Sequence, residues 1–318
     1  MPTATSQIVA QLQRSIAHAI YGKEEAIQLA LITLLARGHL LIEDVPGVGK
    51  TTLAQALARS FHCTFQRIQF TSDLLPSDVL GVSVYNPETR EFEFREGPIF
   101  ANVVLADEIN RTTPRTQSAL LEAMNEAQVS IDGKTMTLPQ PFLVIATQNP
   151  VEHHGTYPLP ESQLDRFLMR IKMGYPSPET ERAILRNRVG PLLDNPVDKL
   201  EAVADVAEVM AMQDAVAHIK VDSSLHDYAL DIVNRTRTSE QLALGVSPRG
   251  TLMLQRAAQA RAFLDGRDYC LPDDFKQLAV PVFSHRVVAS SRHASLQKKS
   301  ETTESVLRDI VESVRVPL

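Results

Sequence analysis

The stretch that decides the fold is Leu40-Leu41-Ile42-Glu43-Asp44-Val45-Pro46-Gly47-Val48-Gly49-Lys50-Thr51-Thr52. Its apolar beginning predicts a buried strand, its two glycines predict a loop, and the residues that follow predict a helix. A strand, a glycine-rich loop and a helix in this order form the usual context of a phosphate-binding P-loop. Glycines let successive N–H groups turn toward phosphate oxygens, and the helix dipole favours an anion at the same place. The stretch therefore predicts a site for a nucleoside triphosphate.

Two side chains of this loop have distinct expected roles. Lys50 supplies a positive charge for the β- and γ-phosphates, and the Thr51 hydroxyl suits a Mg²⁺ ligand. Asp44 departs from the P-loop template, which has a glycine at that position. A glycine turn before an ordinary helix is the alternative interpretation. The residues expected to surround the phosphates are Pro46, Gly47, Val48, Gly49, Lys50, Thr51 and Thr52.

The composition is that of an ordinary globular protein large enough for two domains. The 318 residues are 44% hydrophobic and 22% charged, and the net charge of −6 argues against a surface built to hold nucleic acid. Cys63 and Cys270 lie far apart without companion ligands, so we expect buried thiols and neither a disulfide nor a zinc site. His153 and His154 lack a third ligand nearby and are expected to be polar loop residues.

The N-terminus has no basic segment followed by a compact apolar core, so no signal peptide is expected. The longest apolar stretch, residues 26–36, is too short to span a bilayer. The cytoplasm is therefore the expected compartment.

The order of predicted elements divides the chain in two. Residues 1–174 alternate apolar strands with helices, which indicates an α/β fold with a parallel sheet between two helical layers. Two hairpins interrupt this pattern, around residues 86–89 and around Asp132-Gly133. Residues 175–318 show only helical periodicity, with helix starts at residues 177–178, 222–223 and 247–248, and are expected to form an all-α domain.

Polar residues end the two apolar strands that follow the P-loop. Asp107 and Glu108 come directly after residues 102–106, and the carboxyl ends of parallel strands open on the ligand crevice. We expect Asp107 to hold Mg²⁺ and Glu108 to accept a proton from the attacking water. Asn149 follows residues 142–147 and could orient that water, or it could be an ordinary polar loop residue.

Five segments together resemble the MoxR family of AAA+ ATPases. They are residues 43–51 (EDVPGVGKT), 105–111 (LADEINR), 116–124 (TQSALLEAM), 146–150 (ATQNP) and 155–167 (GTYPLPESQLDRF), and the likeness extends to Ser247-Pro248-Arg249. The resemblance implies a P-loop NTPase core, a three-layer αβα sandwich, followed by a helical lid. It also makes Asp44 part of a family pattern rather than a defect of the motif.

The resemblance implies roles for further residues. Arg166 matches the arginine finger that reaches the nucleotide of a neighbouring subunit, although it could instead pair with Asp165 or Glu161. Arg249 matches the sensor 2 arginine of the lid, with a solvated cation as the alternative.

Other matches are weaker. Tyr21 and Gly22 occupy the place where AAA+ proteins contact adenine. The hairpins match the insertions of the helix-2-insert group. Arg111 and Arg115 flank the acidic pair and could be ring-interface contacts or solvated charges.

The implied function is Mg²⁺-dependent hydrolysis of ATP in a homo-oligomeric ring, expected to be a hexamer. Binding of ATP would close the lid, and the cycle would move the hairpins and remodel a client protein complex. A separate von Willebrand factor A domain protein is the expected partner. The alternatives are a magnesium-chelatase-type ATPase subunit, a nucleic-acid motor and a nucleotide-locked scaffold with little turnover.

Overall fold

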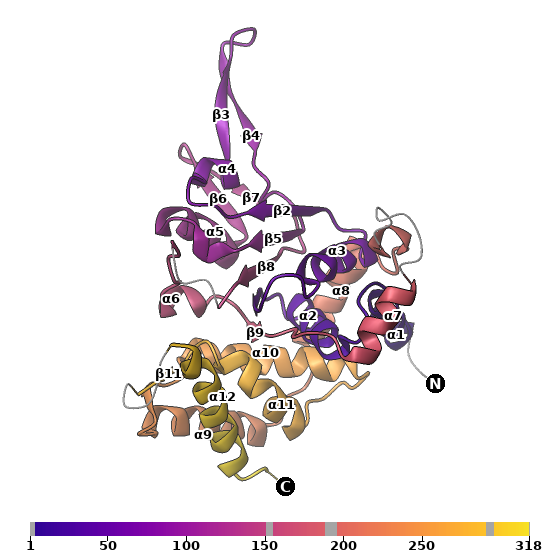
Figure 1. Ribbon diagram of the computed structural model, residues 1–318, viewed down its shortest axis with the longest axis vertical. Coiled ribbons are helices and arrows are strands. Elements are labelled where there is room, and N and C mark those ends of the chain that lie inside the picture. The colour runs from indigo at the N-terminus through magenta and orange to yellow at the C-terminus, as the bar shows by residue number, and fades with distance from the viewer. Residues whose placement is uncertain (1–3, 151–154, 188–195, 291–295, 318) are drawn as a thin grey trace.

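A five-stranded parallel sheet forms the centre of the first half of the protein (Figure 1). The computed structural model describes residues 4–150, 155–187, 196–290 and 296–317. The strands lie in the order β2-β5-β8-β1-β9, and each neighbouring pair is parallel. Their bounds are β1 (Leu40–Glu43), β2 (Phe65–Gln69), β5 (Val103–Asp107), β8 (Leu143–Gln148) and β9 (Met169–Ile171). Chain order switches direction around β1, so a ligand crevice is expected at the carboxyl end of that strand.

Alternate residues of the central strands face two separate hydrophobic cores. Leu40 and Ile42 of β1 belong to the first core, whereas Leu41 belongs to the second. The first core contains α1 (Ala4–Ala19), α2 (Glu24–Leu35) and α3 (Lys50–Ser60), and the second contains α4 (Pro76–Leu80) and α5 (Pro114–Glu126). Helices thus cover both faces of the sheet, and the expected αβα sandwich is confirmed.

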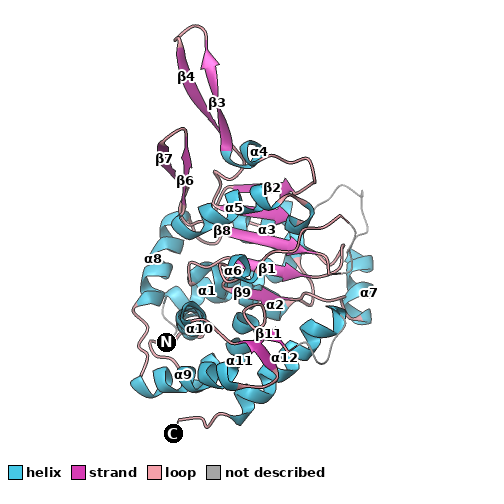
Figure 2. Ribbon diagram, turned by 90° about the vertical axis from the view of Figure 1, so that its left-hand side faces the viewer, coloured by secondary structure: helices cyan, strands magenta, loops and turns pink. Residues whose placement is uncertain are grey.

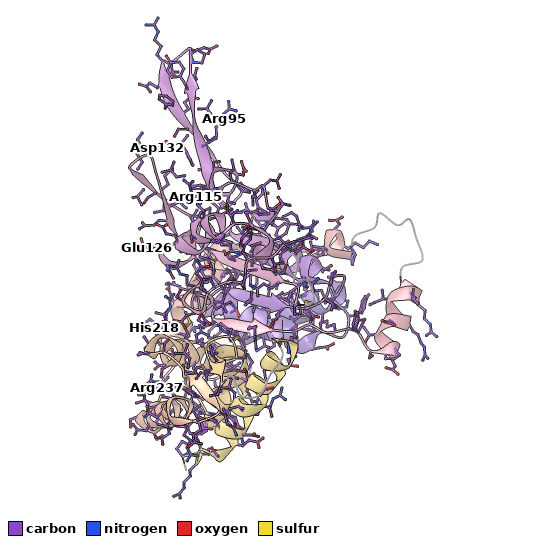
Figure 3. All side chains as sticks on the ribbon, turned by 60° about the vertical axis from the view of Figure 1, so that its left-hand side comes forward. Arg95, Arg115, Glu126, Asp132, His218 and Arg237 are labelled. Atoms are coloured by element: carbon purple, nitrogen blue, oxygen red, sulfur yellow. The ribbon has the colours of Figure 1, made fainter. Side chains whose placement is uncertain are left out.

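Two antiparallel hairpins project beyond the β2 edge of the sheet (Figure 2). The longer one joins β3 (Gly81–Asn86) to β4 (Glu91–Glu96), and the shorter one joins β6 (Gln128–Ile131) to β7 (Lys134–Thr137). Arg95 on β4 and Asp132 at the second turn mark these neighbouring hairpins in Figure 3. The Ser83 hydroxyl donates a 2.6 Å hydrogen bond to Asp132, so the two hairpins touch.

The second half of the chain is helical, with one small sheet that the sequence did not predict. Its helices are α7 (Pro178–Asn187), α8 (Val206–Ala217), α9 (Ser223–Thr238), α10 (Pro248–Leu264), α11 (Pro272–Phe283) and α12 (Leu296–Ser313). The short strands β10 (Leu242–Leu244) and β11 (Val288–Ala289) pair antiparallel, so the expectation of helices alone is wrong in this detail. Strands of two or three residues are too short to reveal alternation in a sequence.

Three shorter helical turns complete the described elements: α6 (Glu161–Leu164) before β9, and the 3₁₀ turns η1 (Ile109–Arg111) and η2 (Pro196–Lys199). The expected helix starts are present, because Asp222 and Ser247 accept hydrogen bonds from the N–H groups of Ser224 and Gly250.

The helical half packs directly on the sheet domain. Helices α8 and α10 contact α2, and α11 contacts β9. Buried residues of both halves belong to one continuous hydrophobic cluster. The boundary at residue 174 therefore stays a prediction, since the core does not divide there.

A search of the described residues finds no helix with the length and apolar character needed to cross a membrane. Cys270 is buried as expected, whereas Cys63 is half-exposed, and both thiols are free. His153 and His154 lie outside the described residues.

Candidate active site

The glycine-rich loop adopts a conformation that requires its glycines. Gly47 and Gly49 have φ angles of +85° and +97°, in the left-handed region that other residues rarely adopt. Open space surrounds a Cβ built on Gly47, so its backbone angle rather than crowding demands glycine. Gly49 immediately precedes Lys50, the first residue of α3. The loop thus brings a helix N-terminus and a lysine to the carboxyl end of β1, where an anion is favoured.

Lys50 lies close to the acidic residues that were expected to share its site. Its ammonium group donates a 2.5 Å hydrogen bond to the carbonyl oxygen of Asp44. Burial lowers the pKa of Lys50, while the charges of Asp44, Asp107 and Glu108 oppose that change. The P-loop and the acidic strand end therefore meet in the folded chain, as the sequence predicted.

Asp44 ties the loop to the chain that leaves β9. One carboxylate oxygen accepts hydrogen bonds from the N–H groups of Met173 (2.7 Å) and Gly174 (2.5 Å). The other accepts one from the N–H group of Val45 (2.8 Å). The Lys23 ammonium group binds the carbonyl oxygens of the same segment, residues 173–175. An aspartate thus fastens the loop at the position where the P-loop template has a glycine.

A buried threonine joins the two acidic residues. The Thr147 hydroxyl donates to Oδ1 of Asp107 (2.6 Å) and accepts from the N–H group of Glu108 (2.9 Å). Thr147 is 1% exposed and lies in β8, the neighbour of β5. The remaining oxygen of Asp107 forms an ion pair with Arg67 of β2 at 2.6 Å. Neither Thr147 nor Arg67 was predicted from the sequence to contact the acidic pair.

Two donors bind the half-buried carboxylate of Glu108. Its backbone is left-handed, with φ +58° and ψ +48°, an uncommon conformation for a residue with a side chain. Oε2 accepts hydrogen bonds from Gln69 of β2 (2.7 Å) and from Arg111 (2.9 Å). Arg111 therefore contacts the expected catalytic base within its own chain. The sequence had suggested either a ring-interface contact or a solvated charge for Arg111. Arg115 is exposed on α5 (Figure 3).

Asn149 follows β8 directly, and Tyr21 and Gly22 come just before Lys23, which binds the segment after β9. Asn149 is buried directly after β8, whose last residue, Gln148, accepts a hydrogen bond from the N–H group of Asp44. Gly22 has a φ angle of +68°, and a Cβ there would lie 2.6 Å from the Thr180 hydroxyl of α7. The roles of Asn149 beside the phosphates and of Tyr21 and Gly22 beside the base stay predictions.

Arg166 and Arg249 lie at the amino end of the strands, opposite the P-loop. Arg166 precedes β9, and its guanidinium group donates to the carbonyl oxygen of Leu121 in α5. In Figure 1, α6 precedes β9 and α7 follows it, and the two helices lie on opposite sides of the molecule. Among the described contacts, Arg166 pairs with neither Asp165 nor Glu161, and Asp165 binds Arg286 instead.

Arg249 is equally remote from its own P-loop. Its guanidinium group donates to the side-chain oxygen of Asn125 at the end of α5 (2.8 Å). It also contributes to the low pKa of His39, which directly precedes β1. Residue 39 stands before the strand and Lys50 after it, so a single chain cannot bring Arg249 and Lys50 to one phosphate in this arrangement.

The oxygen atoms near Lys50 fit a magnesium ion. Thr51 follows Lys50 in α3, and the Asp107 carboxylate lies near enough to affect Lys50. A hydroxyl and a carboxylate, completed by phosphate oxygens and water, form the donor set that Mg²⁺ takes in nucleotide sites. Over the described ranges, no group of three or more His, Cys, Asp or Glu side chains offers a different metal site.

The fold and this site define an ATPase of the AAA+ class, with a P-loop core and a C-terminal helical lid. The profile of the "ATPase family associated with various cellular activities (AAA)" matches residues 39–169. The "AAA lid domain" profile matches residues 234–310. A crystal structure from Cytophaga hutchinsonii, described as "a putative ATPase", aligns with 99% of this chain and 96% of that one, with a TM-score of 0.87 and 34% identity.

Relatives at the sequence level narrow the class to a family. The chain is 50% identical to the uncharacterized protein YeaC of Bacillus subtilis, over 95% of this chain and 93% of that protein. It is 42% identical to Chaperone MoxR1 of Mycobacterium tuberculosis, over 94% of this chain and 79% of that protein. The chain belongs to the MoxR family of AAA+ ATPases.

Proposed function

We propose that this ATPase works as a homo-oligomeric ring, a hexamer, that hydrolyses ATP between subunits and remodels a partner protein complex. The observation that carries the proposal is that Lys50 lies at the carboxyl end of the parallel strands, whereas Arg166 and Arg249 lie at their amino end. A neighbouring subunit can supply the two arginines that a single chain holds away from its own P-loop. An arginine supplied in trans is worth about 10³–10⁵ in rate in related phosphoryl transfers.

The residues of one chain then divide the chemistry. Lys50 exchanges the carbonyl oxygen of Asp44 for the β- and γ-phosphates of ATP. Thr51 and Asp107 would hold Mg²⁺, which neutralises charge on the phosphate oxygens when bound. Glu108 accepts the proton of the attacking water, and Asn149 orients that water. Tyr21 and Gly22 contact the adenine.

The hairpins are the proposed output of the cycle. On the longer hairpin, Tyr85 and Phe92 stack edge to face with ring centroids 5.4 Å apart, yet they are 50% and 70% exposed. Glu88, Glu91 and Glu93 lie exposed near the same turn and outnumber the one cation among them, Arg90. Exposed aromatic groups with acidic neighbours suit a protein client and disfavour nucleic acid. A separate von Willebrand factor A domain protein is the partner that we propose, in the cytoplasm.

Two single substitutions test the ATPase assignment. Lys50→Ala should abolish nucleotide binding, whereas Glu108→Gln should keep binding and lose hydrolysis. Binding is measured with a fluorescent nucleotide and hydrolysis by phosphate release. If Glu108→Gln hydrolysed ATP at the rate of the parent protein, Glu108 could not be the general base.

Mixing experiments test the shared site. Arg166→Ala and Lys50→Ala subunits are each expected to be inactive alone. A mixture should regain activity, because some interfaces then combine an intact P-loop with an intact arginine. Mixed rings that form, as judged by light scattering, and stay inactive would contradict the proposal.

A further inference from the structure

A buried arginine connects the two segments that carry Arg166 and Arg249. Arg286 is 4% exposed, and its Nε donates a 2.8 Å hydrogen bond to Oδ1 of Asp165. Its remaining N–H groups bind the carbonyl oxygens of Asp165, Phe167, Leu168 and Val282. Burial lowers the pKa of Arg286 to about 10, and the Asp165 carboxylate acts against that change, so the side chain stays charged at neutral pH. A buried cation of this kind depends strongly on its carboxylate partner.

Asp165 reaches both segments at once. It is the chain neighbour of Arg166, and its carboxylate accepts hydrogen bonds from the Ser247 hydroxyl at 3.3 and 3.5 Å. Ser247 caps α10, and Arg249 lies in the first turn of that helix. The same turn packs against Arg286, since a Cβ on Gly250 would lie 3.0 Å from the Arg286 side chain.

The two outer arginines also share a support. Arg166 binds the carbonyl oxygen of Leu121, and Arg249 binds the side chain of Asn125. Residues 121 and 125 are four positions apart in α5, so they lie one above the other on the same helix face. Both guanidinium groups therefore bind acceptors one helical turn apart on the same helix.

We propose that Asp165 and Arg286 are positioning residues that hold Arg166 and Arg249 at a fixed spacing, so that both enter the neighbouring subunit's nucleotide site as one unit. This inference rests on the proposed shared site and adds the device that aligns it. Groups placed in advance stabilise a transition state better than groups that must be ordered during the reaction. Asp165 also offsets the repulsion between Arg249 and Arg286, since Arg249 lowers the pKa of Arg286 and Asp165 raises it.

The test separates subunits that supply arginines from subunits that supply the P-loop. Donor subunits carry Lys50→Ala, and acceptor subunits carry Arg166→Ala together with Arg249→Ala. Hydrolysis in mixed rings then occurs only where donor arginines face an acceptor P-loop. Adding Asp165→Asn to the donor should lower kcat by about 10²-fold, because misplacement by about 1 Å costs that much. The KM for ATP should stay within about twofold, since the acceptor P-loop sets it.

The matched control places the same substitution in the acceptor. Asp165→Asn then removes the same buried partner from a subunit whose arginines are already absent, and kcat should stay within about twofold. An equal loss in both placements would show a purely structural role and overturn the inference, and so would no loss in either. If mixed rings of donor and acceptor subunits that both keep Asp165 are inactive, the result contradicts the proposed shared site and not the role of Asp165.

A double-mutant cycle covers the case in which Asp165→Asn subunits do not fold. Donors carrying Arg166→Ala, Arg249→Ala or both are compared against one acceptor. If the two arginines act as one unit, each single substitution should lower kcat nearly as much as the double substitution does. Single losses that multiply to give the double loss would overturn the proposal.

Discussion

The side-chain amide of Gln69 donates a 2.7 Å hydrogen bond to Oε2 of Glu108, the carboxylate expected to activate water. Arg111 donates a 2.9 Å hydrogen bond to the same oxygen. Because this oxygen already accepts two hydrogen bonds, the attacking water must compete with Gln69 and Arg111 for it. Glu108 is thus restrained by β2, a strand whose partner register places Gln69 opposite Asp107.

Replacing Gln69 should release this restraint. Gln69→Ala removes one hydrogen bond to a charged group, and we expect basal kcat to rise by about fivefold, which corresponds to about 1 kcal/mol. Steady-state phosphate release measures the change. Gln66→Ala on the same strand, away from Glu108 in the register, is the control. A tenfold fall in kcat would mean that Gln69 instead aligns Glu108 for the reaction.

Thr147 should be sensitive to loss of its hydroxyl alone. Thr147→Val keeps the shape but leaves the buried N–H group of Glu108 and Oδ1 of Asp107 without their partner. We expect a loss of about 1–3 kcal/mol in the free energy of unfolding, together with reduced kcat. Urea denaturation without nucleotide measures the loss. Thr147→Ser keeps the hydroxyl and should retain most of the stability, and equal losses in both variants would exclude the hydrogen bonds as the cause.

Asp44 should stabilise the loop even though the P-loop template has glycine there. Asp44→Gly removes acceptors from the N–H groups of Met173, Gly174 and Val45. We expect the unfolding free energy to fall by about 2–4 kcal/mol and nucleotide binding to weaken. Asp73→Gly makes the same chemical change at an exposed loop position and should cost much less. A loss no greater than that of the control would contradict the role assigned to Asp44.

His39 should make the fold sensitive to acid. Its Nδ1 accepts from the N–H group of Val144 (3.0 Å), so Nε2 carries the proton that binds the carbonyl oxygen of Met124 (2.9 Å). Both ring nitrogens are used in the neutral form, and burial lowers the pKa from 6.5 to about 4.

The sign of the pH effect follows from this difference. The unfolded chain takes up a proton below about pH 6.5, whereas folded His39 does not until about pH 4. Stability is therefore complete above pH 6.5 and declines by roughly 3 kcal/mol as the pH falls to 4. Denaturation midpoints across this range measure the slope. His39→Gln should be less stable at pH 7 but flatter with pH, and an unchanged slope would assign the effect to other groups, such as buried His285.

The sequence predicted features that depend on local order. Apolar runs ended by charged residues placed Asp107, Glu108 and Asn149 at strand ends, and the glycines marked the phosphate loop. Arg67 and Gln69 could not be found in this way, because their contacts depend on β2 lying beside β5 rather than beside β1. Thr147 looked like an ordinary strand residue, since its hydroxyl matters only through partners on another strand. Arg249 lies at the amino end of the strands because of the way the lid packs against α2. No local sequence pattern predicts that packing.

The placement of the two arginines also concerns how much activity a given quantity of protein has. β1 has four residues, so at the usual rise of a strand roughly 13 Å of backbone lies between His39 and the start of the phosphate loop. In the proposed ring, only a second copy of the chain can bring the arginines to the phosphate loop. Each active site therefore forms only when two chains associate. The rate per chain should then increase with protein concentration and level off once assembly is complete. Dilution alone would silence the enzyme while every chain remained folded.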